Sequence, residues 1–119
     1  MECDDLQVHN YAEEMGMSIY YVFFLRKGPT RSLDSTPEID VFQEAHLANY
    51  SRLEELGKLA VTVPFLDAFA ISGDLRGMGV LKAGSFGEAR ELISTDPLVK
   101  VNRLIFELHP WMIAKNIFP

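Results

Sequence analysis

The sequence has little from which a disulfide framework, a thiolate metal site or a membrane span could be built. Its 119 residues include one cysteine, Cys3, which cannot close an intramolecular disulfide and has no second cysteine with which to bind zinc. No apolar run approaches the ~18 residues that cross a bilayer. Eight glycines and six prolines are too few for a low-complexity chain. A chain of this length supports one hydrophobic core, so we expect one soluble domain.

Positive charge is also scarce, and it is missing from the start of the chain. Eleven Lys and Arg face 17 Asp and Glu, a net charge of −6, and such a balance repels phosphate backbones, which argues against nucleic acid as a partner. No Lys or Arg precedes residue 18, whereas five acidic residues do: Glu2, Asp4, Asp5, Glu13 and Glu14. We therefore divide the chain into an acidic N-terminal extension, residues 1–17, and a nearly neutral domain, residues 18–119.

The extension has neither the basic start nor the apolar stretch of a secretory signal, so we expect a cytoplasmic protein with no membrane partner. It is interpreted as flexible or loosely docked. The alternative is a short amphipathic segment that covers a neighbouring surface with its apolar residues, namely Leu6, Val8, Tyr11, Met15 and Met17.

Residues 19–25 are rich in β-branched and aromatic residues and end at a turn, which predicts a strand that is apolar on both faces. A helix is expected to begin near Thr36-Pro37, or at a Ser35/Glu38 capping box, and to end at Gly57. Its predicted buried stripe consists of Phe42, Ala45, Asn49, Leu53 and Leu56, with His46 beside it. Residues 59–65 predict a second strand.

After a glycine-rich turn at 73–77, residues 78–83 predict a third strand, and a Ser85/Glu88 capping box opens a short helix that breaks at Asp96-Pro97. Residues 103–109 predict the last strand. The order β-α-β-β-α-β indicates an α+β, ferredoxin-like fold, in which an antiparallel sheet carries two helices on one face. Its other face is too apolar to meet water, so we expect a homodimer in which two sheets face each other.

Several segments, in order, resemble the YCII-related domain family over residues 18–112. They are Gln43–Asn49, Leu53–Leu59, Gly73–Gly77, Glu88–Leu92, Thr95–Pro97 and Glu107–Trp111. The resemblance implies a dimeric α+β barrel and a catalytic pair formed by His46 and Asp96. It also implies cofactor-independent acid-base chemistry on a small cyclic or aromatic ring, since one branch of the family eliminates chloride from chlorinated hydroxyquinones. The family usually has Gly-Pro where this chain has Val63-Pro64, and the added bulk would reshape the pocket.

Each candidate residue also has a structural interpretation. Histidine suits proton transfer near neutral pH, yet His46 could simply border the helix stripe. Asp96 precedes a proline and is therefore a good helix N-cap, which uses one carboxylate oxygen and leaves the other for His46. Arg76 could hold an anionic substrate group or form a surface salt bridge. Tyr50 could offer a phenol to the substrate or pack in the core.

The three histidines, His9, His46 and His109, have no metal-binding spacing, so no metal or other cofactor is expected. His109 is assigned a structural role, and His9 a solvated position. Two functions follow: a small-molecule enzyme that uses His46 and Asp96 in an elimination or isomerisation, or a non-catalytic dimeric module that binds a small molecule or a protein. Haem binding or cofactor-free oxygenation is a third interpretation, and it depends on fold analogy alone.

Overall fold

The computed structural model of the chain describes residues 4–29, 37–65 and 74–118. Four strands form one antiparallel sheet in the order β2-β3-β1-β4. The strands are β1 (Met17–Lys27), β2 (Leu59–Pro64), β3 (Leu75–Leu81) and β4 (Leu104–Ala114). The helices are α1 (Asp5–Glu14), α2 (Pro37–Glu55), α3 (Phe86–Ile93) and α4 (Pro97–Lys100). The strand order and the βαββαβ succession of the domain confirm the predicted ferredoxin-like α+β fold.

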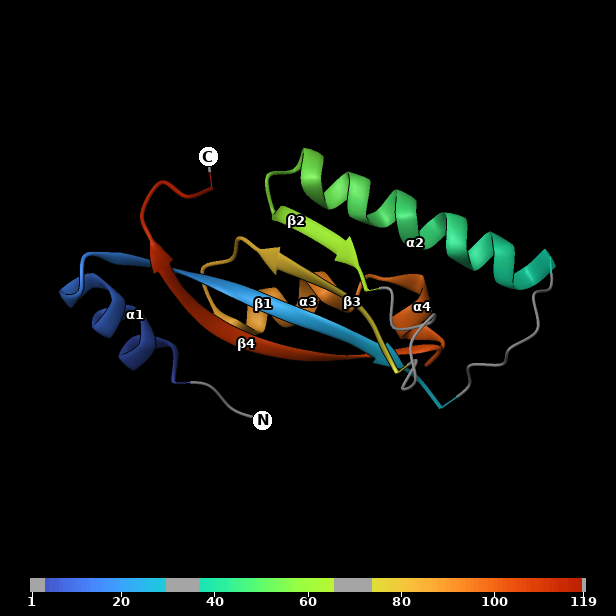
Figure 1. Cartoon of the computed structure of the whole chain (residues 1–119), viewed down its shortest axis with the longest axis horizontal. Helices are drawn as coiled ribbons and strands as arrows, with labels where there is room; N and C mark the ends of the chain where they lie inside the picture. The colour runs from blue at the N-terminus through green and yellow to red at the C-terminus, as the bar shows by residue number, and fades with distance from the viewer. Residues whose placement is uncertain (1–3, 30–36, 66–73, 119) are drawn as a thin grey trace.

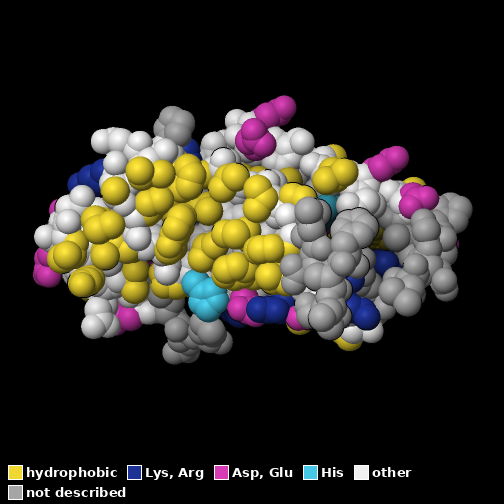
Figure 2. Space-filling view, in the orientation of Figure 1, with side chains coloured by type: hydrophobic (Ala, Val, Ile, Leu, Met, Phe, Trp, Pro, Cys, Tyr) yellow, Lys and Arg dark blue, Asp and Glu magenta, His cyan; other side chains and the backbone are white. Residues whose placement is uncertain are grey.

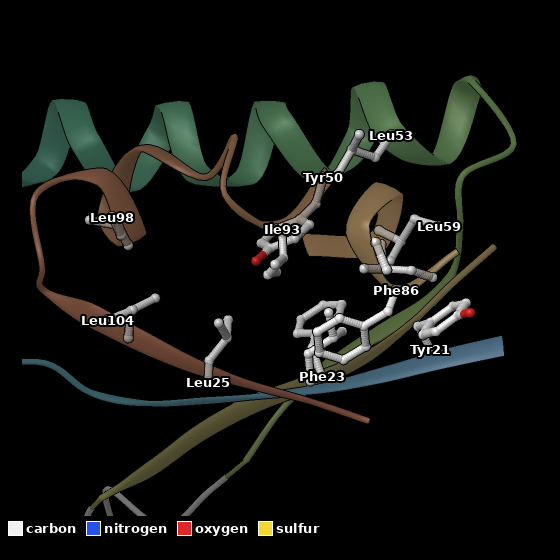
Figure 3. Close-up of a cluster of buried hydrophobic side chains, with 13 residues drawn as sticks. Tyr21, Phe23, Leu25, Tyr50, Leu53, Leu59, Phe86, Ile93, Leu98 and Leu104 are labelled. Atoms are coloured by element: carbon white, nitrogen blue, oxygen red, sulfur yellow. The ribbon is translucent and has the colours of Figure 1, made fainter. Parts of the chain in front are cut away.

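One face of the sheet carries the core, because alternate residues of a strand point to the same side. Tyr21, Phe23 and Leu25 of β1 point toward α2, α3 and α4 and are at most 4% exposed (Figure 3). The ring of Phe23 lies over Gly79 of β3, where a Cβ atom would come within 2.3 Å of it. The close approach of this aromatic ring therefore explains why position 79 is a glycine.

The opposite side of the sheet, which we call the open sheet face, has no helix over it among the described elements (Figure 1). The strand registers place these apolar residues on it: Tyr20, Val22, Phe24, Val61, Val63, Met78, Val80 and Trp111. Hydrophobic side chains gather over this face (Figure 2), and Val61, Val63 and Trp111 are each at least 40% exposed. Soluble monomers rarely expose a continuous group of apolar side chains of this kind.

Residues 5–14 of the acidic N-terminal extension form helix α1. Asp4 caps it by accepting a hydrogen bond from the Gln7 amide. The Asp5 carboxylate then ties the helix to the domain, because it accepts hydrogen bonds from the Tyr21 hydroxyl (3.2 Å) and from the Phe86 amide (2.8 Å) at the start of α3. Helix α1 is therefore attached to the domain through Asp5, while its apolar residues Leu6 and Tyr11, and Met15 after its end, remain exposed.

Among the strand boundaries, the start of β3 and the end of β4 differ most from the sequence prediction. β3 begins at Leu75, inside the segment 73–77 for which the sequence predicts a turn. Gly77 of this segment pairs with Leu25 of β1 and is therefore part of the strand. β4 runs past Pro110 to Ala114, where the sequence predicted an end at residue 109. A proline is tolerated there because β4 is an edge strand, and an edge strand has one side with no ladder to donate to.

Helix α2 ends near Gly57, as predicted, with that glycine at a φ of +73°. The start signals at residues 35 and 36 lie outside the described residues. The predicted buried stripe is wrong in part, since Phe42 is 36% exposed and Leu56 is 59% exposed, whereas Tyr50 and Leu53 are buried. The N-terminal half of α2 runs beyond the end of β2 (Figure 1), so the sheet does not cover that half. No helix in the described part of the chain is long and apolar enough to span a membrane.

Candidate functional site

Helix α2 brings three polar side chains to one side, because residues four apart lie one turn above each other. These are His46, Tyr50 and Glu54, and all three line a cavity between α2 and the sheet. Tyr50 descends from α2 into the core (Figure 3), where its ring stacks on Phe23 with the two planes 6° apart. The buried ring of Tyr50 therefore fixes the rotation of the helix and, with it, the position of His46.

Asp96 stands at the junction between α3 and α4 and is fully buried. It is the N-cap of α4, with Pro97 in the first turn, and its Oδ1 accepts a hydrogen bond of 2.9 Å from the Leu98 amide. The hydroxyl of Thr95, the preceding residue, accepts a hydrogen bond of 3.0 Å from the Asn49 side chain on α2. The junction is thus held against α2 by a contact next to the carboxylate.

The second oxygen of Asp96, Oδ2, receives two side chains from α2. It lies 2.7 Å from Nδ1 of His46 and 2.8 Å from the Tyr50 hydroxyl, which donates to it. A carboxylate oxygen only accepts hydrogen bonds, so the proton of the neutral imidazole lies on Nδ1. Nε2 of His46 is then left with an unshared electron pair, and the His46 side chain remains 13% exposed. This is the arrangement in which a carboxylate orients a histidine base.

Burial, with Asp96 as a second cause, raises the pKa of Tyr50 above its ordinary range. A charged phenolate would lie in the core beside a carboxylate, and both effects oppose its formation. Tyr50 therefore remains a hydrogen-bond donor to Asp96 throughout the physiological pH range.

The raised pKa of Tyr50 predicts a loss of stability at alkaline pH. The unfolded tyrosine releases its proton near its ordinary pKa of 10.0, while the folded one retains it, so the folded state binds more protons above that pH. The free energy of unfolding should fall by about 1.4 kcal/mol per pH unit above pH ~10 from this group alone. Urea denaturation of the wild type and of Tyr50→Phe between pH 8 and 11 measures it. The slope of Tyr50→Phe should be smaller by that amount, and equal slopes would contradict the prediction.

The cavity beside His46 has a volume of about 510 Å³. Leu25, Leu98 and Leu104 form an apolar part of its wall, and Arg76 of β3 also lines it. Val63 and Pro64 of β2 also line it. A larger groove of about 1060 Å³ lies between α1 and the end of the sheet, but no histidine lines it.

The structure therefore brings His46, Asp96 and Tyr50 into contact and places Arg76 in the same cavity. Of the two roles that the sequence allows Tyr50, contact with the substrate or packing in the core, the buried ring matches the second, and its hydroxyl is directed to Asp96. His109 lies on β4, 3.5 Å from Glu107, and takes no part in the cavity. His9 is not free in solvent, because its Nε2 lies 2.9 Å from the Tyr21 hydroxyl.

Sequence reasoning missed Asn49 and Thr95, which hold the junction, and Glu54, which lines the cavity. The four-residue spacing of His46, Tyr50 and Glu54 was the available signal for Glu54. Within the residues that the structure describes, no group of three or more His, Cys, Asp or Glu is placed to hold a metal ion.

Comparisons with known proteins give one named likeness. No family model matches the chain, and no curated protein matches it. Among solved structures, the chain is similar to a 5-chloro-2-hydroxyhydroquinone dehydrochlorinase from Burkholderia phenoliruptrix, solved in complex with 2,5-dihydroxybenzoquinone. The identity is 21%, the TM-score is 0.47, and the match covers 76% of this chain and 92% of that one.

Proposed function

We propose that the protein is a small-molecule enzyme in which His46, oriented by Asp96, acts as a general base without a cofactor. The observation that carries the proposal is the buried carboxylate that accepts hydrogen bonds from both His46 and Tyr50 beside a cavity. A histidine held in one tautomer presents a single basic nitrogen, and general-base catalysis of this kind contributes about 10² to 10⁴ in rate.

The reaction class that suits this base is elimination or isomerisation on a small cyclic or aromatic substrate, as the sequence resemblance implies. In a dehydrochlorination of a chlorinated hydroquinone, the chlorinated ring carbon is tetrahedral in the keto tautomer, and Nε2 of His46 takes the proton of a hydroxyl group conjugated with that carbon. The O–H electron pair forms a C=O bond, the ring double bond moves to the chlorinated carbon, and chloride leaves with the electrons of the C–Cl bond. Asp96 stabilises the imidazolium until its proton passes to water. In an isomerisation the same proton is delivered to a ring carbon.

The tautomer of His46 provides the direct test of the base. Nitrogen NMR of the ring at alkaline pH, assigned with His46→Gln, should show the proton on Nδ1 and a bare Nε2. In Asp96→Asn the amide would have to present its NH₂ to the ring while its oxygen caps α4, and the proton should move to Nε2. Asp74→Asn, at an exposed carboxylate, is the matched control and should leave the tautomer unchanged. A proton on Nε2 in the wild type would contradict the proposal.

Turnover is tested with chlorinated and hydroxylated hydroquinones by the release of chloride. His46→Gln and Asp96→Asn should each lower the rate by about 10²-fold or more, with little change in the binding of the compound. A compound that binds in the cavity and is released unchanged by the wild type, across the whole panel, would favour the non-catalytic binding module instead.

We also propose that the molecule acts as a homodimer through the open sheet face. The face is apolar at its centre, and ion pairs of Arg26 with Asp74 and with Glu107 lie along one end of it. A hydrophobic centre with a charged border is the usual composition of a stable interface between subunits. A second copy of the chain would cover the face with the same residues, as a two-fold axis requires.

A further inference from the structure

Arg76 occupies an irregular position in β3, where the side chains of the strand depart from their regular alternation between the two faces of the sheet. Leu25 of β1 pairs with Gly77, but the next residue, Arg26, pairs with Leu75. Between these two pairs β3 advances by two residues while β1 advances by one, so Arg76 is the extra residue of a β-bulge. Bulges occur next to functional sites because they re-aim a side chain.

The guanidinium of Arg76 lacks a partner for one of its donors. Its Nε is buried, and it has no hydrogen-bond acceptor among the described residues. The acid nearest along the chain, Asp74, is bound to Arg26 at 3.0 Å, so its carboxylate is already engaged. A surface salt bridge, the other role considered for Arg76, is accordingly not seen in the described part of the chain. A buried donor with no acceptor is costly unless an occupant of the cavity supplies one.

The surroundings of Arg76 suit a flat anion. The cavity has the volume of a small-molecule site and an apolar wall of leucine side chains, which matches an aromatic ring. Glu54 and Arg76 are the acidic and basic side chains that line it beside His46. Glu54 is exposed and, within the described residues, forms no hydrogen bond with the buried Nε of Arg76.

We propose that Arg76 binds a planar oxyanion, a carboxylate or an ionised phenol, on a small aromatic ligand that lies against the leucine wall. The fork of the guanidinium matches the two oxygens of a carboxylate and can direct two N–H groups at the single oxygen of a phenolate, whereas lysine offers a point charge. This inference depends on the proposed function only in making that ligand the substrate on which His46 acts. It narrows the substrate class from small rings in general to aromatic acids and acidic phenols.

The test is binding to the full chain of three probes of similar size: benzoate, 4-nitrophenolate and the neutral benzamide. Benzoate should bind more tightly than benzamide and should shift the Nε–H signal of Arg76 in NMR spectra. Arg76→Gln should weaken the binding of benzoate by about 10- to 100-fold and leave benzamide unchanged. Arg76→Lys should recover only part of the loss. Arg90→Gln, at an exposed arginine of α3, is the control and should bind benzoate like the wild type.

Equal affinities for benzoate and benzamide, or an Nε–H signal of Arg76 that benzoate does not shift, would overturn the proposal. Both measurements use the wild-type protein, so they do not depend on whether an Arg76 variant folds. Tighter binding of 4-nitrophenolate than of benzoate would assign the site to phenols rather than carboxylates. The outcome is independent of the His46 tautomer. If the protein selects benzoate but the proton of His46 lies on Nε2, the anion site stands and the protein is a binding module. If the proton lies on Nδ1 but benzoate is not preferred, His46 can still act as the base, and the proposed substrate class is removed.

Discussion

Asp96→Ala should lower the free energy of unfolding by about 3–5 kcal/mol, because the change leaves several buried donors without an acceptor. The Leu98 amide, the Tyr50 hydroxyl and Nδ1 of His46 all use this carboxylate, which is fully buried. Alanine cannot replace any of the three bonds, and it also removes the cap of α4. Urea denaturation at neutral pH measures the loss as a lower midpoint with an unchanged slope.

Two further variants make this prediction specific. Asp74→Ala removes a carboxylate that is half exposed and pairs with Arg26, so it should cost at most about 1 kcal/mol. Tyr50→Phe removes one of the three donors and keeps the ring in the core, so its effect should lie between the two. If Asp96→Ala were no more destabilising than Asp74→Ala, the hydrogen bonds at the junction would not be present in solution.

The second large effect is expected on the association of the chain. The wild type should have about twice the chain mass of 13.5 kDa in light scattering at micromolar concentration. Val61→Glu and Trp111→Glu place a charge on the two edge strands of the open sheet face, β2 and β4, where both residues are 40% exposed. A buried, unpaired carboxylate at each copy of the interface should weaken the dimer by well over 100-fold and give a monomer.

Leu56→Glu is the matched control for these variants. Leu56 is 59% exposed, but it follows the end of α2 on the helical side of the molecule. The Leu56→Glu variant should therefore remain a dimer. A wild type that is monomeric at micromolar concentration would contradict the prediction, and so would dissociation by Leu56→Glu to the same extent as by Val61→Glu.

The succession of strands and helices could be predicted because each domain element carries a local signal. The Ser85 cap, the Asp96-Pro97 pair and the apolar run of β1 all encode structure within a few residues. The misjudged boundaries have a different origin. Gly77 indicates a turn when read locally, yet it belongs to β3, where it pairs with Leu25 of β1 and the leucine side chain lies over it. Tertiary packing overrode the local preference.

The candidate site divides in the same way. That Asp96 would cap a helix with one oxygen could be derived from its neighbour Pro97, and the contact of the other oxygen with His46 is present in the structure. Spacing along the chain could not supply this contact, because 50 residues separate the two side chains. The bulge at Arg76 was equally out of reach, since it depends on the register between two strands.

The position of β1 has a consequence for the order in which the molecule acquires its structure. β1 is synthesised before α2 and β2, but both strands that pair with it, β3 and β4, follow those elements in the chain. On the ribosome, this strand, which is apolar on both faces, has neither neighbouring strand until those segments have been made. Such long-range pairing slows folding and leaves an aggregation-prone segment exposed in the meantime. Helix α1 also docks only after α3 has been made, because Asp5 binds the first turn of α3.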